Sequence, residues 1–391
     1  MNPSASGWIK KLLKNCDSNH PVFLLDEDAL YKNLRACGFI YGSNLHVIEK
    51  VFEKSDFTEE EICKINLCLA LLYIHNKAET STNFTESVIN FYNSVNETKT
   101  TFFKALLGEK KTTEQLEKIF HKRVQIDNNI VTKNFKYFIV NALLFVDVLG
   151  YKRYLENEKI SVDYLIKIEE SIAAISLNVL NSKAEKNQYD ESLIKLFESS
   201  LRYFDSDTND YNKAILNIKS PLEKQYLLDL ACMATWTDKV IDIQEQKFLI
   251  TLARDLNVEK SVLKSSIITI NSFYTENKDN IALLSSKNIV QSFYDNSSKM
   301  VTKLISRNKK RLYKELLDSK ELMVLLTQST VRDLTKEEQK KVQEQLFDIF
   351  KSIPSLAIFM LPGGAILLPL VIKFIPKLLP SAFDENRVEE D

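Results

Sequence analysis

Apolar side chains recur along most of this chain at intervals of three and four residues, the spacing that places them on one face of an α-helix. After Thr58 the apolar positions on a single helical face are Ile62, Ile65, Leu69, Leu72 and Tyr73. Three further stripes are Leu227, Leu230, Ala231 and Ala234; Phe248, Leu249, Leu252 and Leu256; and Leu263, Ile267 and Ile270. The pattern predicts amphipathic helices, and those within 221–280 are expected to form one compact unit.

Turn-forming residues are scarce in the body of the chain. Between Val22 and Ile353 the proline is Pro221, and the glycines are Gly38, Gly42, Gly108 and Gly150. Sheet-rich folds need many turn residues, so this scarcity favours long helices joined by polar loops. The sequence therefore predicts an all-α fold made of multi-helical domains.

Helix starts are marked by residues that can cap the first turn. The capping-box patterns are Thr58–Glu61, Thr112–Gln115, Ser220–Glu223 and Thr335–Glu338. In each, a hydroxyl can accept a backbone N–H and the side chain three residues on can return the bond. Pro221 also suits the first position of a helix.

A polar stretch, 205–210, precedes the start at Ser220 and predicts a domain boundary near residue 210. We expect an N-terminal helical domain at 1–210, whose role the sequence does not indicate. A second helical domain follows at 211–333, a membrane segment at 334–383 and an acidic tail at 384–391.

The membrane segment contains a long apolar run in which no residue from Ser352 to Ile372 is charged. A stretch of this length can cross a hydrocarbon core of roughly 30 Å. Its interruptions are Pro354, Pro362, Gly363, Gly364 and Pro369. One interpretation is a kinked transmembrane helix with Lys373 and Lys377 reaching the far interface. The other is a hairpin of two short helices, either re-entrant or buried against protein. The lipid bilayer is the favoured partner.

The prolines of this segment also carry a family resemblance. The sequence reads Leu334-Thr-Lys-Glu-Glu-Gln339, then Pro362-Gly-Gly-Ala-Ile-Leu-Leu-Pro369, and closes with Lys373-Phe-Ile-Pro376-Lys-Leu-Leu-Pro380-Ser-Ala-Phe383. It resembles the membrane segment of the LETM family, which comprises mitochondrial inner-membrane proteins and bacterial relatives. The resemblance implies attachment to a bacterial inner membrane. Because no secretory signal is evident at the N-terminus, the bulk of the chain is expected in the cytoplasm.

Two departures from the LETM pattern bear on function. Members proposed to exchange cations for protons carry a glutamate where this chain has Ala365, and an intramembrane carboxylate is the natural carrier. The family's ribosome-binding region follows the membrane segment, and this sequence ends within a dozen residues of that segment. Neither exchange nor ribosome binding is therefore carried over residue by residue.

Three carboxylates, Asp238, Asp242 and Glu245, lie close together around a predicted helix–helix turn. Oxygen ligands of this kind can hold a divalent cation, the one cofactor that the sequence leaves open. Alternatively, Asp242 and Glu245 cap the second helix. Residues 221–280 resemble the TerB-like helical domain of tellurite-resistance proteins, which implies an interaction or sensing module. Lys239 stands where that family usually has glycine, which weakens the metal interpretation.

A basic cluster places five cations within eight residues: Arg307, Lys309, Lys310, Arg311 and Lys314. Such a cluster can meet anionic lipid headgroups or ribosomal RNA. The alternative is the solvated face of a helix. Tyr313 is the aromatic residue within the cluster, so recognition of single-stranded nucleic acid has little support.

Composition and short motifs narrow the classes of function that remain open for this chain. Lys and Arg total 52 against 53 Asp and Glu, so no overall charge attracts nucleic acid and specific DNA binding is not expected. Glycine-rich phosphate loops and common hydrolase motifs are absent from the sequence, which argues against an enzyme. We therefore expect a non-enzymatic, membrane-anchored adaptor in envelope or ion homeostasis, compatible with a homo-oligomer. The alternatives are cation/proton transport through an oligomer of the C-terminal segment, and a ribosome- or RNA-associated factor.

Overall fold

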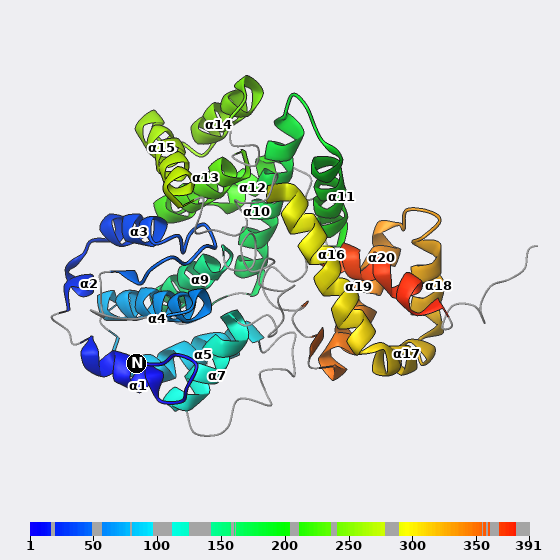
Figure 1. Ribbon diagram of the computed structural model, residues 1–391, viewed down its shortest axis with the longest axis horizontal. Coiled ribbons are helices and arrows are strands. Elements are labelled where there is room, and N and C mark those ends of the chain that lie inside the picture. The colour runs from blue at the N-terminus through cyan, green and yellow to red at the C-terminus, as the bar shows by residue number, and fades with distance from the viewer. Residues whose placement is uncertain are drawn as a thin grey trace, which may run out of the picture.

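The computed structural model is helical throughout the part of the chain that it describes, which confirms the all-α prediction (Figure 1). It describes residues 1–16, 20–48, 57–78, 80–96, 112–124, 142–157, 160, 162–203, 211–235, 241–277, 289–353, 355–356, 359 and 367–380. The helices are α1 (Trp8–Asn15), α2 (Pro21–Leu24), α3 (Glu27–Ala36), α4 (Glu59–Lys77), α5 (Phe84–Asn96), α7 (Thr113–Val124), α9 (Leu144–Asn157), α10 (Val162–Ser182), α11 (Gln188–Tyr203), α12 (Tyr211–Asn217), α13 (Pro221–Thr235), α14 (Ile243–Asp255), α15 (Lys260–Asn277), α16 (Ile289–Arg307), α17 (Lys309–Leu317), α18 (Lys320–Gln328), α19 (Lys336–Ser352) and α20 (Leu368–Leu378).

The predicted helix starts are confirmed by their hydrogen bonds. Reciprocal capping boxes form at Thr58 and Glu61, at Ser220 and Glu223, and at Thr335 and Glu338. At α7 the hydroxyl of Thr112 accepts the N–H of Gln115 at 3.3 Å. These local signals were readable from the sequence because each box lies within four consecutive residues.

Helix α4 is buried on all sides, whereas the sequence predicted one apolar face. Its side chains outside that face are buried too, including Cys63, Leu67, Cys68 and Leu71. The surrounding helices explain this, since α4 packs against α2, α5, α7 and α9. A helix enclosed in this way is the core of the N-terminal region rather than a surface helix.

Two buried polar contacts hold the helices around α4 in place. The carboxylate of Glu117 in α7 accepts the backbone N–H groups of Gly7 and Ile9, each at 2.9 Å, and so caps the start of α1. Arg123 of α7 forms a buried ion pair with Asp147 of α9, with its Nε 2.7 Å from Asp147 Oδ2. Both contacts satisfy groups that would be costly to leave unpaired in the interior.

Helix α10 connects the N-terminal helices with those that follow residue 210. It packs against α9 and α11 on one side of the predicted boundary and against α12, α13 and α14 on the other. Figure 1 shows it running through the middle of the molecule. The boundary near residue 210 remains a prediction, and the packing across it is extensive.

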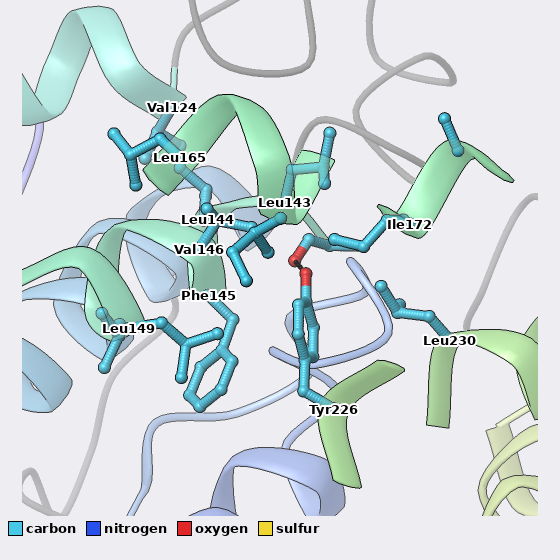
Figure 2. Close-up of a cluster of buried hydrophobic side chains, with 14 of the residues drawn as sticks. Val124, Leu143, Leu144, Phe145, Val146, Leu149, Leu165, Ile172, Tyr226 and Leu230 are labelled. Atoms are coloured by element: carbon cyan, nitrogen blue, oxygen red, sulfur yellow. Dashed lines mark hydrogen bonds between the residues drawn. The ribbon is translucent and has the colours of Figure 1, made fainter. Parts of the chain in front are cut away.

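A shared aromatic core lies at this junction (Figure 2). Phe145 of α9 and Tyr226 of α13 lie with ring centroids 5.0 Å apart. The buried hydroxyl of Tyr226 donates to the carbonyl of Ala142 at 2.6 Å. Leu165 and Ile172 of α10 belong to the same cluster. Side chains from both predicted domains therefore build one hydrophobic cluster.

A polar tie also crosses the predicted boundary. Asp229 of α13 accepts a hydrogen bond from the Tyr31 hydroxyl at 2.7 Å and lies 3.2 Å from Arg35 Nε, both from α3. Arg35 Nε also donates to the Tyr41 hydroxyl at 3.1 Å. The Arg35 and Asp229 side chains are 3% and 0% exposed, so the pair is shielded from solvent.

Helices α13, α14 and α15 pack on one another, as the three apolar stripes predicted. The buried members of the stripes include Leu227, Leu249, Leu252 and Ile270. Helices α16–α20 form a separate group that contacts the rest of the protein largely through α11 (Figure 1). This C-terminal group contains both the basic cluster and the segment that resembles the LETM family.

Candidate functional site

The candidate site is the C-terminal group of helices, α16–α20. Helix α20 packs against α16, α11 and α18, and α18 packs against α17 and α19. Within α20, Leu368, Leu370, Val371, Ile372 and Ile375 are buried. The part of the apolar run that α20 contains therefore lies inside a helical bundle.

Some prolines and glycines of the predicted membrane segment lie among the described residues, and others do not. Pro354, Pro362, Gly363, Gly364 and Ala365 lie outside the described residues. Pro369 lies in the first turn of α20, where a missing N–H costs nothing, and Pro376 lies near its end. Pro380 follows the helix.

In the described residues, no helix combines the length and the apolar character needed to cross a bilayer. Helix α20, with 11 residues, is the longest described helix of the apolar run. The transmembrane prediction is therefore not confirmed. The short, packed α20 agrees with the alternative of a helix buried against protein.

Lys373 and Lys377, predicted to reach a membrane interface, both extend from α20. Lys373 Nζ lies 3.1 Å from the Tyr294 hydroxyl of α16 and 5.8 Å from the centroid of that ring. Lys377 is one helical turn further along. Both side chains are exposed at the edge of the bundle.

The basic cluster is divided between two helices rather than lying on one helical face. Arg307 ends α16, and Lys309, Lys310, Arg311 and Lys314 lie on α17. Asn308 lies at the turn between the helices, and its side-chain amide donates to the Leu304 carbonyl at 2.7 Å. We call the five cations around this turn the basic corner.

All five cations of the basic corner are exposed. Within the described part of the chain, the four on α17 have no carboxylate partner. On the opposite face of α17, Leu312 and Leu316 are buried in the bundle. Helix α17 is thus fixed by its apolar face and presents unneutralised positive charge to its surroundings.

The basic corner is attached directly to the beginning of the apolar run. The Ser355 hydroxyl donates to Asn308 Oδ1 at 2.9 Å. Ser355 is 47 residues from Asn308 in the sequence, and no local sequence pattern predicts this contact. The structure therefore brings the two predicted membrane features, positive charge and the start of the apolar segment, to one place.

The start of the LETM-like segment is held by a forked ion pair. The Arg332 guanidinium donates to both carboxylate oxygens of Glu338, at 2.7 and 2.9 Å, while Glu338 also caps α19 through the Thr335 N–H. The Arg332 hydrogen bonds, together with that capping bond, lower the pKa of Glu338 to about 2. Hydrogen bonding to the charged form of a carboxylate favours ionisation.

We expect Arg332→Ala to return the pKa of Glu338 towards the ordinary glutamate value of about 4.3, leaving only the capping bond to lower it. Because the pKa of Glu338 is lowered in the folded state, its interactions stabilise the fold at pH values above the ordinary glutamate pKa. This stabilisation is lost as pH falls towards 2. Carboxyl-carbon chemical shifts followed through a pH titration measure this directly. Glu321, which pairs with Lys341, serves as the internal control and should titrate unchanged. An unchanged Glu338 titration would contradict the assigned cause.

The carboxylates predicted as metal ligands act as a helix cap. Asp242 Oδ1 accepts the Glu245 N–H at 2.7 Å, and Glu245 returns the bond to the Asp242 N–H at 2.9 Å. Asp242 Oδ2 accepts the Ala184 N–H at 3.1 Å. These bonds lower the pKa of Asp242, and the Glu245 N–H has the largest effect. Asp238 lies outside the described residues.

No group of three metal-ligating side chains occurs among the described residues. Asp242 and Glu245 are explained by capping, so the capping alternative stated for them is confirmed. A divalent-cation site at Asp238, Asp242 and Glu245 remains an untested prediction.

Comparison with known proteins identifies the C-terminal segment. Residues 334–391 match the family model described as LETM1-like, RBD. A mitochondrial proton/calcium exchanger protein from Drosophila melanogaster is 40% identical over 55 residues, which cover 14% of this chain and 5% of the fly protein. No solved structure matches the chain. The segment is therefore LETM-related, as its proline spacing indicated, and the similarity covers a small part of the fly protein's length.

Proposed function

We propose that this chain is a non-enzymatic, LETM-related adaptor that attaches a large helical body to a membrane and acts in envelope or ion homeostasis. We place it at a bacterial inner membrane, with the bulk of the chain in the cytoplasm and a TerB-like unit at α13–α15 as its interaction module. The LETM1-like match at 334–391 supports the family assignment of the attached segment. A role in ion homeostasis is suggested by the fly relative, which is named as a proton/calcium exchanger.

The observation that carries the proposal is the basic corner and its link to the apolar run. Four cations of α17 are exposed without a carboxylate partner among the described residues, and Asn308 at the corner holds Ser355. Lysine and arginine next to an acidic bilayer contribute about 1 kcal/mol each near the surface. Leu356 and Phe359, the described apolar residues that follow Ser355, are buried, so the exposed contact at this point is electrostatic.

This arrangement suits a membrane surface better than a neutral protein partner. Attraction between the corner and acidic lipids falls within a Debye length of about 8 Å at physiological ionic strength, so binding is expected to weaken as salt is added. The net charge of the molecule gives little help, since the formal charge of the whole chain is −1. The membrane contact is therefore local.

We expect reversal of Lys309, Lys310, Arg311 and Lys314 to Glu to weaken binding to vesicles containing phosphatidylglycerol by at least about a hundredfold, because attraction becomes repulsion. Flotation of the full chain with such vesicles measures this, and phosphatidylcholine vesicles show the charge-independent part. The matched control reverses four exposed cations on α14 and α15: Lys247, Arg254, Lys260 and Lys264. It changes the net charge equally and should leave binding within about twofold.

Equal losses in the corner variant and the control would contradict a local membrane contact. Absence of flotation by the unaltered chain at low salt would also contradict it. If the unaltered chain instead co-sediments with ribosomes, and the corner variant alone loses that binding, the ribosome-associated alternative is supported.

Cation/proton transport through an oligomer remains the other candidate. It is favoured by the fly relative, which is named as a proton/calcium exchanger, and it needs a polar group in the apolar run. Cation flux in liposomes reconstituted with the purified chain would support it. Vesicle binding without flux supports the adaptor.

A further inference from the structure

A cleft of about 460 Å³ opens on the C-terminal bundle between α11, α16, the link that precedes α19, and α20. Figure 1 shows α11, α16 and α20 meeting in this part of the molecule. The side chains of interest that line it are Lys195, Tyr294, Arg332, Asp333, Lys373 and Lys377. Small-molecule sites typically occupy about 300–1,000 Å³, so the cleft has room for more than a bare ion.

Positive charge predominates in this cleft. Lys195 approaches from α11, and Lys373 and Lys377 project from one face of α20. Asp333 is the acidic residue among the lining side chains. The charge of Arg332 is offset by its forked pair with Glu338. Lys373 and Lys377 by themselves outnumber the Asp333 carboxylate, so positive charge is in excess.

The two lysines of α20 lack an anionic partner in the described structure. Because they are four residues apart on a helix, their charges repel each other. An anion placed between them would remove that repulsion and gain two charge-assisted hydrogen bonds.

Tyr294 adds a directional donor. Its hydroxyl oxygen accepts from Lys373 Nζ at 3.1 Å, so the phenolic hydrogen is free to point elsewhere. The wall formed by α20 also carries the apolar residues Pro369, Leu370 and Ile372, next to its lysines. The cleft thus combines several cationic donors and a hydroxyl with a surface suited to a small organic group.

We propose that this cleft binds a phosphate monoester, with the phosphate held by Lys373, Lys377 and Tyr294 and its organic part against the apolar residues of α20. A phosphate group offers three strong acceptor oxygens and about two negative charges, which match the lysines and the hydroxyl. The ester is either free in solution or the headgroup of phosphatidic acid, a phospholipid whose phosphate is a monoester. This ligand goes beyond the proposed membrane contact, because the cleft and the basic corner use different residues.

The test titrates the full chain with glycerol 3-phosphate by calorimetry, and in a second arm with vesicles containing phosphatidic acid. We expect Lys377→Glu and Lys373→Glu each to weaken binding at least tenfold, and Tyr294→Phe to weaken it several-fold. Lys264→Glu on α15 is the matched control, with the same charge change on an exposed helix, and should bind as the unaltered chain does. Lys377→Gln, which removes the charge without reversing it, provides a milder variant should a glutamate variant fail to fold.

Cleft-dependent binding of glycerol 3-phosphate identifies a free ester as the ligand, and cleft-dependent binding of vesicles alone identifies a headgroup. The basic-corner variant should retain glycerol 3-phosphate binding, which separates this site from the proposed membrane contact. Failure of both probes to bind at low salt would overturn the proposal, as would binding that is unchanged in Lys373→Glu and Lys377→Glu.

Discussion

Gly38→Ala is expected to lower the free energy of unfolding by about 4 kcal/mol. Gly38 has φ +85°, a left-handed conformation that costs an L-residue roughly 1–2 kcal/mol. A Cβ atom there would lie 1.7 Å from the Ser43 carbonyl oxygen and 2.7 Å from Phe273 Cζ. Because the first of these atoms is backbone, the turn must open, and overpacking of this kind costs about another 1–3 kcal/mol.

The turn at Gly38 matters because it joins distant parts of the molecule. The Gly38 carbonyl accepts the N–H groups of Tyr41 and Ser43, each at 3.0 Å. Tyr41 in turn contacts Phe273 of α15 with ring centroids 5.0 Å apart. Opening the turn would therefore separate the N-terminal helices from α15.

The chain supplies a matched control in Gly7, which has φ +88° and no atom within 4 Å of an added Cβ. Gly7→Ala should cost only the conformational part, about 1–2 kcal/mol. Urea denaturation followed by circular dichroism measures both variants. If the two substitutions destabilise equally, the steric explanation for Gly38 is wrong.

Local features of this fold could be predicted from the sequence because their determinants are adjacent. The box at Thr335 and Glu338 fixes the start of α19 within four residues. The stripes of α13–α15 likewise gave three packed helices. The same local chemistry correctly offered capping as one explanation for Asp242 and Glu245.

Contacts between distant segments could not be predicted, since no periodicity encodes them. The Asn308–Ser355 hydrogen bond, which places the basic corner beside the apolar run, joins residues 47 apart. The cleft depends on Lys195 of α11 and Lys373 of α20 meeting across the bundle. The sequence identified Lys373, Lys377 and the cations of the basic corner but not Lys195, and only the structure shows which cations lie together.

The packing of α20 also changes how membrane attachment would work. Its apolar residues are satisfied within the bundle, so transferring them to lipid gains little unless the bundle opens. The basic corner needs no such rearrangement, because its cations are already exposed. Electrostatic contact is therefore the first step of the attachment that we propose, and any insertion of the tail would follow it.

An adaptor needs a rigid helical body that keeps its two ends in a fixed arrangement. The buried Arg35–Asp229 ion pair, the polar tie described above, connects α3 to α13. We expect Asp229→Ala to lower the free energy of unfolding by about 3–5 kcal/mol, the usual cost of leaving one charge of a buried pair uncompensated. Besides losing Arg35, the substitution removes the acceptor for the Tyr31 hydroxyl, which lies 2.7 Å away.

The double variant Arg35→Met/Asp229→Leu distinguishes the cost of burying one unpaired charge from the net contribution of the ion pair to stability. Replacing both charges with apolar side chains should recover much of the lost stability, because neither charge is then left buried alone. Asp28→Ala is the control for a surface pair, since Asp28 and Lys32 are 60% and 63% exposed, and it should cost less than about 1 kcal/mol. Urea denaturation of the unaltered chain and the three variants measures these costs. If Asp229→Ala costs no more than Asp28→Ala, α3 and α13 are held by apolar packing alone, and the tie contributes nothing to the rigidity of the body.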